Sequence, residues 1–177
     1  MKVVGTVGLA GSGKGEFAEV ATELGAPVVT MGDVIREACR DRGLDPAEHH
    51  GVVAQQLRNE NGPAAIAEAS LPHIEDALND SDTVLVDGIR SDVEVDVFEK
   101  RFGGAFRLVS IEAPFAVREQ RISERARDNV DEGESLAARD ERERGFGLGD
   151  AMARADRTID NTGTLEAFRT EAREVLE

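Results

Sequence analysis

The sequence predicts a three-layer α/β fold, with a five-stranded parallel sheet covered by helices on both faces. Two observations predict it. Short apolar, β-branched runs alternate along the chain with longer segments of helical spacing, which is typical of βαβ units. Two further segments stand outside this alternation, as expected for appendages over the carboxyl edge of such a sheet, where ligands bind. The chain of 177 residues is long enough for a single domain, 1–177, with a sizeable core.

The expected strands are short and apolar: residues 2–9, 26–30, 82–88, 106–113 and 157–160. Helices are expected at residues 15–24, 92–102, about 114–128 and about 164–176. The first appendage, about 32–79, is mostly helical, with breaks at Gly43–Pro46 and near Gly62 and Pro63. The second, about 121–149, includes a loop at 128–135 that we expect to be mobile. Together these ranges supply the five strands of the predicted sheet and the helices that cover it.

Composition excludes several function classes. The formal net charge of -15 argues against nonspecific binding to nucleic acid or to an anionic membrane. The chain contains no apolar stretch of about 18 residues and no signal-peptide layout. A single cysteine, Cys39, suits a reducing cytosol, and the spacing of His49, His50 and Cys39 matches no zinc site. We therefore expect a cytoplasmic protein, either a monomer or a homodimer.

The basic residues are strongly skewed towards arginine, with 18 Arg and 3 Lys. An acidic, lysine-poor surface favours a salt-loving archaeon, because concentrated salt screens such a charge. An acidic cytosolic protein from a GC-rich genome remains the alternative.

Residues 8–14, GLAGSGK, fit the pattern GxxxxGK between an expected strand and an expected helix. Glycines let backbone N–H groups turn towards a phosphate, the helix N-terminus adds partial positive charge, and Lys14 adds a mobile cation. The sequence therefore predicts a phosphate loop. The residues expected to bind the nucleotide are Gly8, Ala10, Gly11, Ser12, Gly13, Lys14, Gly15 and Glu16.

A phosphate loop normally follows its lysine with Ser or Thr, whose hydroxyl holds Mg²⁺. Here Gly15 and Glu16 follow Lys14. GSGKG resembles the loop of adenylate kinases, which also have glycine after the lysine but usually Thr at the position of Glu16. Because Mg²⁺ often keeps most of its waters, we expect the metal to depend on water held by acidic groups such as Asp87, with Ser12 a weaker candidate.

Two further segments predict an acceptor site. TMGDVIR (30–36) resembles the TGDLLR segment of nucleoside monophosphate kinases. The resemblance implies that Arg36 grips the acceptor's phosphate and that Asp33 caps a helix or contacts the substrate. An Asp cap beside a surface arginine explains the segment equally simply. Arg58 either lines the same pocket or lies on the surface.

The segment DGIRSDVE (87–94) follows the third expected strand. Asp87 is placed where a Walker B acid would lie near Mg²⁺, and Arg90 can bind phosphate bidentately. The segment resembles DGFPR of adenylate kinases and the D-x-R-x-x-x-E stretch of deoxynucleoside monophosphate and phosphomevalonate kinases. Glu94 would end that stretch, or it is a solvated helix acid.

Arg118, Arg121 and Arg125 are spaced by three and four residues and so share one helical face. RISER (121–125) resembles the R-I-x-x-R of adenylate kinase lids, which implies that Arg121 and Arg125 stabilise charge on the transferring phosphoryl group. Arg139 would approach the same phosphoryl group from the side opposite Arg121 and Arg125. The alternative is a solvated helix on which neighbouring glutamates balance the arginines.

Residues 155–168, ADRTIDNTGTLEAF, resemble the A-D-x-x-I-x-N-x-G-x-L-E-x-L ending of dephospho-CoA kinases. The resemblance implies that Asn161 and Gly163 border the adenine. A turn followed by a cap at Thr164 is the alternative.

Over nearly its whole length the chain resembles the P-loop kinase superfamily. GSGKGEF, MGDVIR, DGIRS, the R-D-E-R-E-x-x-x-G-x-G stretch and the N-x-G-T-L-E ending identify it as a member of an archaeal family of adenylate-kinase-like or dephospho-CoA-kinase-like proteins. The resemblance implies the P-loop kinase fold, with an acceptor-binding insert at about 32–79 and a lid at about 121–149. It also implies ATP and Mg²⁺ as cofactors, and the catalytic residues would be Lys14, Asp87, Arg121 and Arg125.

The activity implied is transfer of the γ-phosphoryl group of ATP to a small phosphorylated or nucleotide-like acceptor, such as a nucleoside monophosphate or dephospho-CoA. The alternative is an ATP-binding regulator or slow ATPase that controls a protein partner. An RNA-binding chaperone is disfavoured by the charge and by the absence of Tyr and Trp for base stacking.

Overall fold

The computed structural model describes residues 1–126 and 135–177, and for residues 125 and 126 only the backbone. Five parallel strands form one sheet in the order β2-β3-β1-β4-β5. Their bounds are β1 Lys2–Val7, β2 Val28–Thr30, β3 Thr83–Asp87, β4 Phe106–Glu112 and β5 Arg157–Asp160. The predicted five-stranded parallel sheet is therefore confirmed.

Where a helix was expected, the structure has one close to the expected position. Their bounds are α1 Lys14–Glu23, α2 Met31–Asp41, α3 Pro46–Asn61, α4 Ala65–Asp80, α5 Asp92–Phe102, α6 Phe115–Ala126, α7 Leu136–Gly145, α8 Leu148–Ala153 and α9 Leu165–Leu176. A short 3-10 turn, Gly103–Ala105, follows α5. The loop expected to be mobile, 128–135, lies almost entirely outside the described residues.

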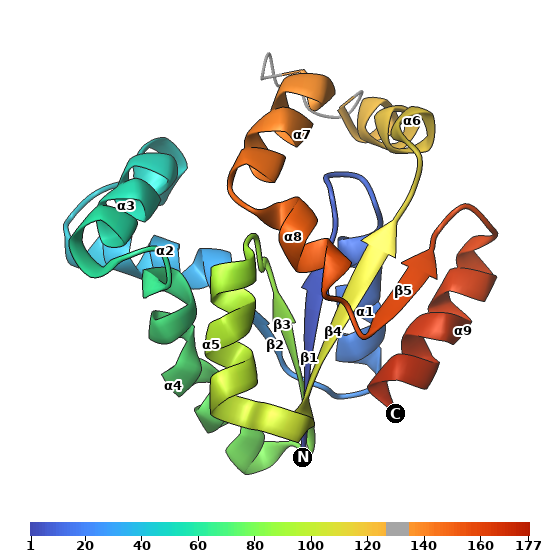
Figure 1. Ribbon diagram of the computed structural model, residues 1–177, viewed down its shortest axis with the longest axis horizontal. Helices are drawn as coiled ribbons and strands as arrows, with labels where there is room; N and C mark the ends of the chain where they lie inside the picture. Colours follow the sequence, from blue (N-terminus) through green and yellow to red (C-terminus); the bar gives the residue numbers. More distant parts are fainter. Residues whose placement is uncertain (127–134) are drawn as a thin grey trace.

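Both faces of the sheet are covered, so the strands are buried on two sides (Figure 1). Neighbouring residues of β1 point to opposite faces. Val3 packs in a core that includes residues of α2, α3, α4, α5 and α8. Val4 packs in a second core, with Phe17 of α1 and Phe168 of α9. This explains why the strand sequences are continuously apolar rather than alternating.

The insert after β2 is broken where the sequence predicted. Helix α2 ends before Gly43 and α3 before Gly62, and both glycines have positive φ angles, 69° and 90°. Asp45 caps α3 by accepting a hydrogen bond from the Ala47 N–H. Because the two breaks turn the chain back on itself, α2 and α3 stand beside the carboxyl ends of the strands (Figure 1).

Helix α8, like α7, was not predicted. Gly147 begins it with a φ of 95°, and Leu148 and Ala151 are buried in the first core. The helix fixes the end of α7 over the sheet, on the opposite side of the carboxyl edge from α3 (Figure 1). None of the described helices is both long and apolar enough to cross a membrane.

Candidate active site

The phosphate loop is a tight turn between β1 and α1. Gly8, Gly11 and Gly13 have φ angles of 154°, 78° and 121°, which L residues with a side chain rarely adopt. A Cβ at Gly8 would clash with the carbonyl oxygen of Ile111, and one at Gly13 with the side-chain amide of Asn161. Glycine is therefore required here by close packing of β4 and the β5–α9 loop as well as by backbone conformation.

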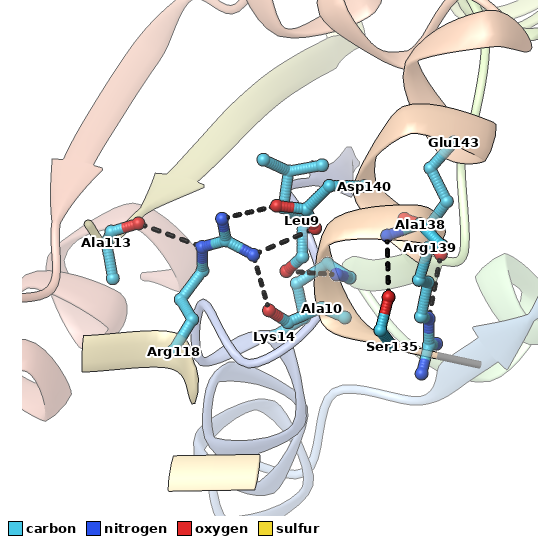
Figure 2. Close-up of polar contacts among 10 residues, drawn as sticks. All are labelled: Leu9, Ala10, Lys14, Ala113, Arg118, Ser135, Ala138, Arg139, Asp140 and Glu143. Carbon is cyan, nitrogen blue, oxygen red and sulfur yellow. Dashed lines mark hydrogen bonds and ion pairs between the residues drawn. The ribbon is translucent and has the colours of Figure 1, made fainter. Parts of the chain in front are cut away.

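Lys14 begins α1, and its ammonium turns back over the loop. Its Nζ donates to the carbonyl oxygens of Gly8, at 2.5 Å, and Leu9, at 3.3 Å (Figure 2 shows the second bond). Burial lowers the pKa of Lys14 below its usual value of 10.5, and the nearby carboxylates of Asp87 and Glu143 oppose that shift. The ammonium is therefore held inside the loop by groups that a phosphate oxygen can replace.

A cavity of about 220 Å³ opens beside Lys14 at the carboxyl edge of the sheet. It lies between the phosphate loop, the insert, the end of β3 and α7. The predicted site residues that line it are Gly8, Ala10, Lys14, Arg36, Arg58, Asp87, Arg90 and Arg139. Two titratable residues that the sequence analysis did not select, His50 and Glu143, line it as well. The structure thus brings together residues from four separate segments.

Asp33 is not among the residues that line this cavity. It lies within the first turn of α2, so its interpretation as a helix cap is wrong, because the helix begins two residues earlier, at Met31. Its Oδ1 accepts hydrogen bonds from Arg36 Nε, at 2.8 Å, and Nη2, at 2.5 Å. The structure therefore places Asp33 as the partner that orients Arg36, and its contact with a substrate stays a prediction.

Asp87 ends β3 directly opposite Thr6 of β1. The Thr6 hydroxyl donates to Asp87 Oδ1 at 3.1 Å. In the described residues no group of three or more His, Cys, Asp or Glu side chains converges as ligands of one metal would. Mg²⁺ at kinase sites typically takes one or two carboxylates together with phosphate oxygens and waters. A single oriented carboxylate beside the phosphate loop fits that mode of binding.

Glu16, the unusual residue of the loop sequence, turns towards α9. It forms an ion pair with Arg169, whose Nη2 also contacts Glu23 at 2.5 Å. A Cβ at Gly15 would meet no atom within 4 Å. The structure therefore explains one departure from the common loop sequence, because Glu16 joins α1 to α9. It does not explain the other, because a side chain at position 15 would meet no steric clash.

Glu94 is buried, with 2% of its surface exposed, although a solvated position was one of its two interpretations. Its Oε2 accepts from the backbone N–H of Arg90 at 2.7 Å, and Arg58 Nη2 lies 3.9 Å from Oε1. Burial raises the pKa of Glu94, and these two partners oppose the shift. Burial also lowers the pKa of His50, with help from the charges of Arg36, Arg90 and Arg58. Of its two interpretations, Arg58 therefore fits the one in which it lines the cavity, where it lies beside Glu94.

Arg121 lies on the outer side of the phosphate loop, away from the cavity that contains Lys14. Its Nη2 donates to the Asn161 carbonyl at 2.7 Å, and its Nη1 to the carbonyls of Gly11 and Ser12 at 3.3 Å. Asn161 Nδ2 donates to the Ser12 carbonyl at 2.8 Å. Arg121, Asn161 and Gly163 line a second hollow. The side chain of Arg125 lies outside the described residues.

Ser12 faces a third hollow and not the Lys14 cavity. Its buried hydroxyl has no hydrogen-bond partner among the residues that the structure describes, and the same hollow is lined by Arg118 and Asp140. Ser12 was the weaker candidate for holding the metal, and the structure does not place it beside Asp87.

Arg118 and Asp140 form a buried ion pair that joins α6 to α7 (Figure 2). Arg118 Nη2 donates to Asp140 Oδ2 at 2.6 Å, and Nη1 also reaches the carbonyl of Ala10 at 3.1 Å. The alternative interpretation, in which glutamates on its own helix balance this arginine, is therefore wrong for Arg118. No helical spacing could predict the pair, because the two residues are 22 positions apart. It connects the predicted lid to the phosphate loop.

The comparisons with known proteins agree with this geometry. A family model described as an AAA domain matches residues 7–136. A UPF0200 protein of Halobacterium salinarum is 58% identical over 99% of this chain and 93% of its own length. The chain belongs to the UPF0200 family. A UPF0200 protein of Methanoregula boonei is 46% identical, over 99% of this chain and 96% of its own. The archaeal family that the sequence predicted is therefore confirmed.

Solved structures show the fold of this UPF0200 chain. The crystal structure of TT1252 from Thermus thermophilus has a TM-score of 0.66 at 22% identity, covering 99% of this chain and 96% of that one. Shikimate kinase from Aquifex aeolicus has a TM-score of 0.55 at 15% identity, covering 98% and 95%. The predicted P-loop kinase fold is confirmed, and the chain is a P-loop nucleotide-binding domain with kinase-like neighbours.

Proposed function

We propose that this protein is an ATP-dependent kinase that transfers the γ-phosphoryl group to a small phosphorylated or nucleotide-like acceptor. One observation carries the proposal: four arginines from separate segments, Arg36, Arg58, Arg90 and Arg139, line one cavity together with Lys14 and Asp87. A slow ATPase would need only water as its acceptor. A cavity with this many cations beside the phosphate loop is better suited to a second anionic substrate.

The loop glycines and Lys14 would bind the β- and γ-phosphates of ATP, and Asn161 and Gly163 would border its base. Mg²⁺ would be held by Asp87, which Thr6 orients, and would neutralise charge on the phosphates. Arg36 and Arg90 would bind the acceptor's anionic group. Arg139 of α7 would reach the transferring phosphoryl group. Arg121 and Arg125 of α6 would stabilise the charge on that group. Phosphoryl transfer depends mainly on positioning and charge, so no strong base is needed.

The first test is acceptor-dependent production of ADP in concentrated KCl with Mg²⁺. The acceptors would be ribonucleoside monophosphates, deoxynucleoside monophosphates and dephospho-CoA, and Lys14→Ala is the inactive control. We expect one acceptor to raise turnover at least about tenfold, and Lys14→Ala to abolish the effect. Slow turnover that no acceptor changes would reject a kinase for these acceptors and favour a nucleotide-controlled regulator of a protein partner.

A further inference from the structure

Glu143 places a buried carboxylate inside the cationic cavity. It is 6% exposed, and it extends from α7 towards the phosphate loop. Its Oε1 accepts from Arg139 Nε at 3.2 Å, and Arg90 Nη1 lies 4.0 Å from the same oxygen (Figure 2 shows the contact with Arg139). One carboxylate oxygen is thus shared by two guanidinium groups that come from different elements.

The two arginines are far less buried than the acid between them. The side chains of Arg90 and Arg139 are 42% and 47% exposed, whereas that of Glu143 is 7% exposed. A surface ion pair gives little stability, and a buried carboxylate loses hydration that such partners replace only in part. The two arginines alone therefore do not account for an acid at this position, which also lies near the buried ammonium of Lys14. The carboxylate lies where an anion bound by both guanidinium groups would lie.

We infer that Glu143 is a built-in counter-ion of Arg90 and Arg139. It excludes monovalent anions from this site, and the phosphate dianion of the acceptor displaces it. A monovalent anion such as chloride brings no more charge than the tethered carboxylate already supplies, so it cannot compete well. A phosphate dianion brings a second charge and three oxygens that match the forks of Arg90 and Arg139. Glu143 would then make the cavity selective for phosphomonoesters, even in concentrated chloride.

The inference rests on the proposed acceptor site but not on phosphoryl transfer, so it can be tested without turnover. Binding of inorganic phosphate would be measured by calorimetry near pH 8, where phosphate is mainly a dianion. Potassium chloride would replace potassium gluconate at constant ionic strength. Wild type would be compared with Glu143→Gln, Glu143→Ala and the matched control Glu141→Gln, since Glu141 is exposed on the same helix.

In low chloride, both Glu143 variants should bind phosphate at least roughly tenfold more tightly than wild type, because one opposing charge has been removed. Their affinity should then fall steeply as chloride replaces gluconate, while that of wild type should change little. Glu141→Gln should match wild type in both respects. Because the phosphate loop can also bind phosphate, the difference must disappear when Arg90→Gln is added to each chain.

Unchanged phosphate affinity and unchanged chloride dependence in both Glu143 variants would overturn the inference. A gain in affinity that survives Arg90→Gln would also overturn it, because it would then arise elsewhere. Failure of both variants to fold, judged by circular dichroism, would show that Glu143 serves stability and would count against it too. If the inference holds while no acceptor stimulates ADP production, the anion site is real and the kinase proposal fails by itself.

Discussion

The ammonium of Lys14 is held by two backbone carbonyls and has its pKa lowered mainly by burial. In the pH window between that lowered pKa and 10.5, the unfolded chain binds more protons than the native one. The free energy of unfolding therefore rises with pH in that window. The residue that is best placed for phosphate thus costs stability while no phosphate is bound.

Replacing Lys14 with an apolar side chain of similar length should remove that cost. Lys14→Met should raise the unfolding temperature of the ligand-free protein by about 2–4 °C, corresponding to about 1 kcal/mol. It should also flatten the dependence of stability on pH below 10.5. Thermal unfolding at several pH values measures both effects. Lys100→Met, at an exposed position, is the control, and a lower unfolding temperature in Lys14→Met would contradict the argument.

Asp87 and Glu16 are two acids that the sequence analysis assigned to the nucleotide site, and the structure gives them different surroundings. Asp87 lines the cavity with Lys14, whereas Glu16 pairs with Arg169 on α9. Asp87→Asn should raise the Mg²⁺ concentration needed for ATP to stabilise the protein by about tenfold or more, because Mg²⁺ prefers anionic oxygen. Glu16→Gln should leave it unchanged. Mg²⁺ titration of the ATP-dependent shift in unfolding temperature tests this, and equal effects of the two variants would refute it.

Helices α6 and α7 are held together by Arg118 and Asp140, and through Arg118 they contact the phosphate loop at Ala10. Removing the acid leaves a buried guanidinium without its charge partner, which is far costlier than losing a surface pair. Helices α6 and α7 and the phosphate loop should therefore loosen together.

Asp140→Asn should lower the free energy of unfolding by about 3 kcal/mol. It should also speed amide hydrogen exchange both in residues 8–14 and in α6, because the two are tied through Arg118. Asp150→Asn, at an exposed carboxylate of α8, should change neither. Faster exchange confined to α7 would show that the pair does not couple α6 and α7 to the loop.

An element could be predicted from the sequence where the residues that determine it are consecutive in the chain. The strands and the breaks at Gly43 and Gly62 were predicted, and the cap at Thr164 was one of two interpretations of its segment, because each depends on a few consecutive residues. Helix α8 was not, since Leu148 and Ala151 are defined as core residues only by what packs on them.

The same limit applies to the site. The loop and the arginines were found from their motifs, and the pairing of Arg139 with Glu143 follows a spacing of four that the sequence contains. The Thr6–Asp87 bond depends on strand register, and Arg118–Asp140 joins two helices that the sequence separates. The sequence analysis therefore identified the cations of the cavity better than the acids that orient or oppose them.

The charge of the whole chain, -15, makes the compact state repel itself when little salt is present. Screening shortens the range of that repulsion from about 10 Å at 0.1 M salt to about 3 Å at 1 M. The unfolding temperature should therefore rise by roughly 10 °C between dilute and molar KCl, corresponding to about 3 kcal/mol of relieved repulsion. Calorimetric scans across KCl concentrations measure it. A flat or falling response would argue against adaptation to concentrated salt.

The bond from the Asn161 side chain to the Ser12 carbonyl joins residues 149 positions apart. Synthesis from the N-terminus makes the phosphate loop long before Asn161, so its support arrives only after β5 has been made. A nascent chain that stops before residue 161 carries every loop glycine and Lys14, yet it lacks the amide that holds the Ser12 carbonyl. Competence to bind a nucleotide would thus be acquired late, when nearly all of the sheet is already in place.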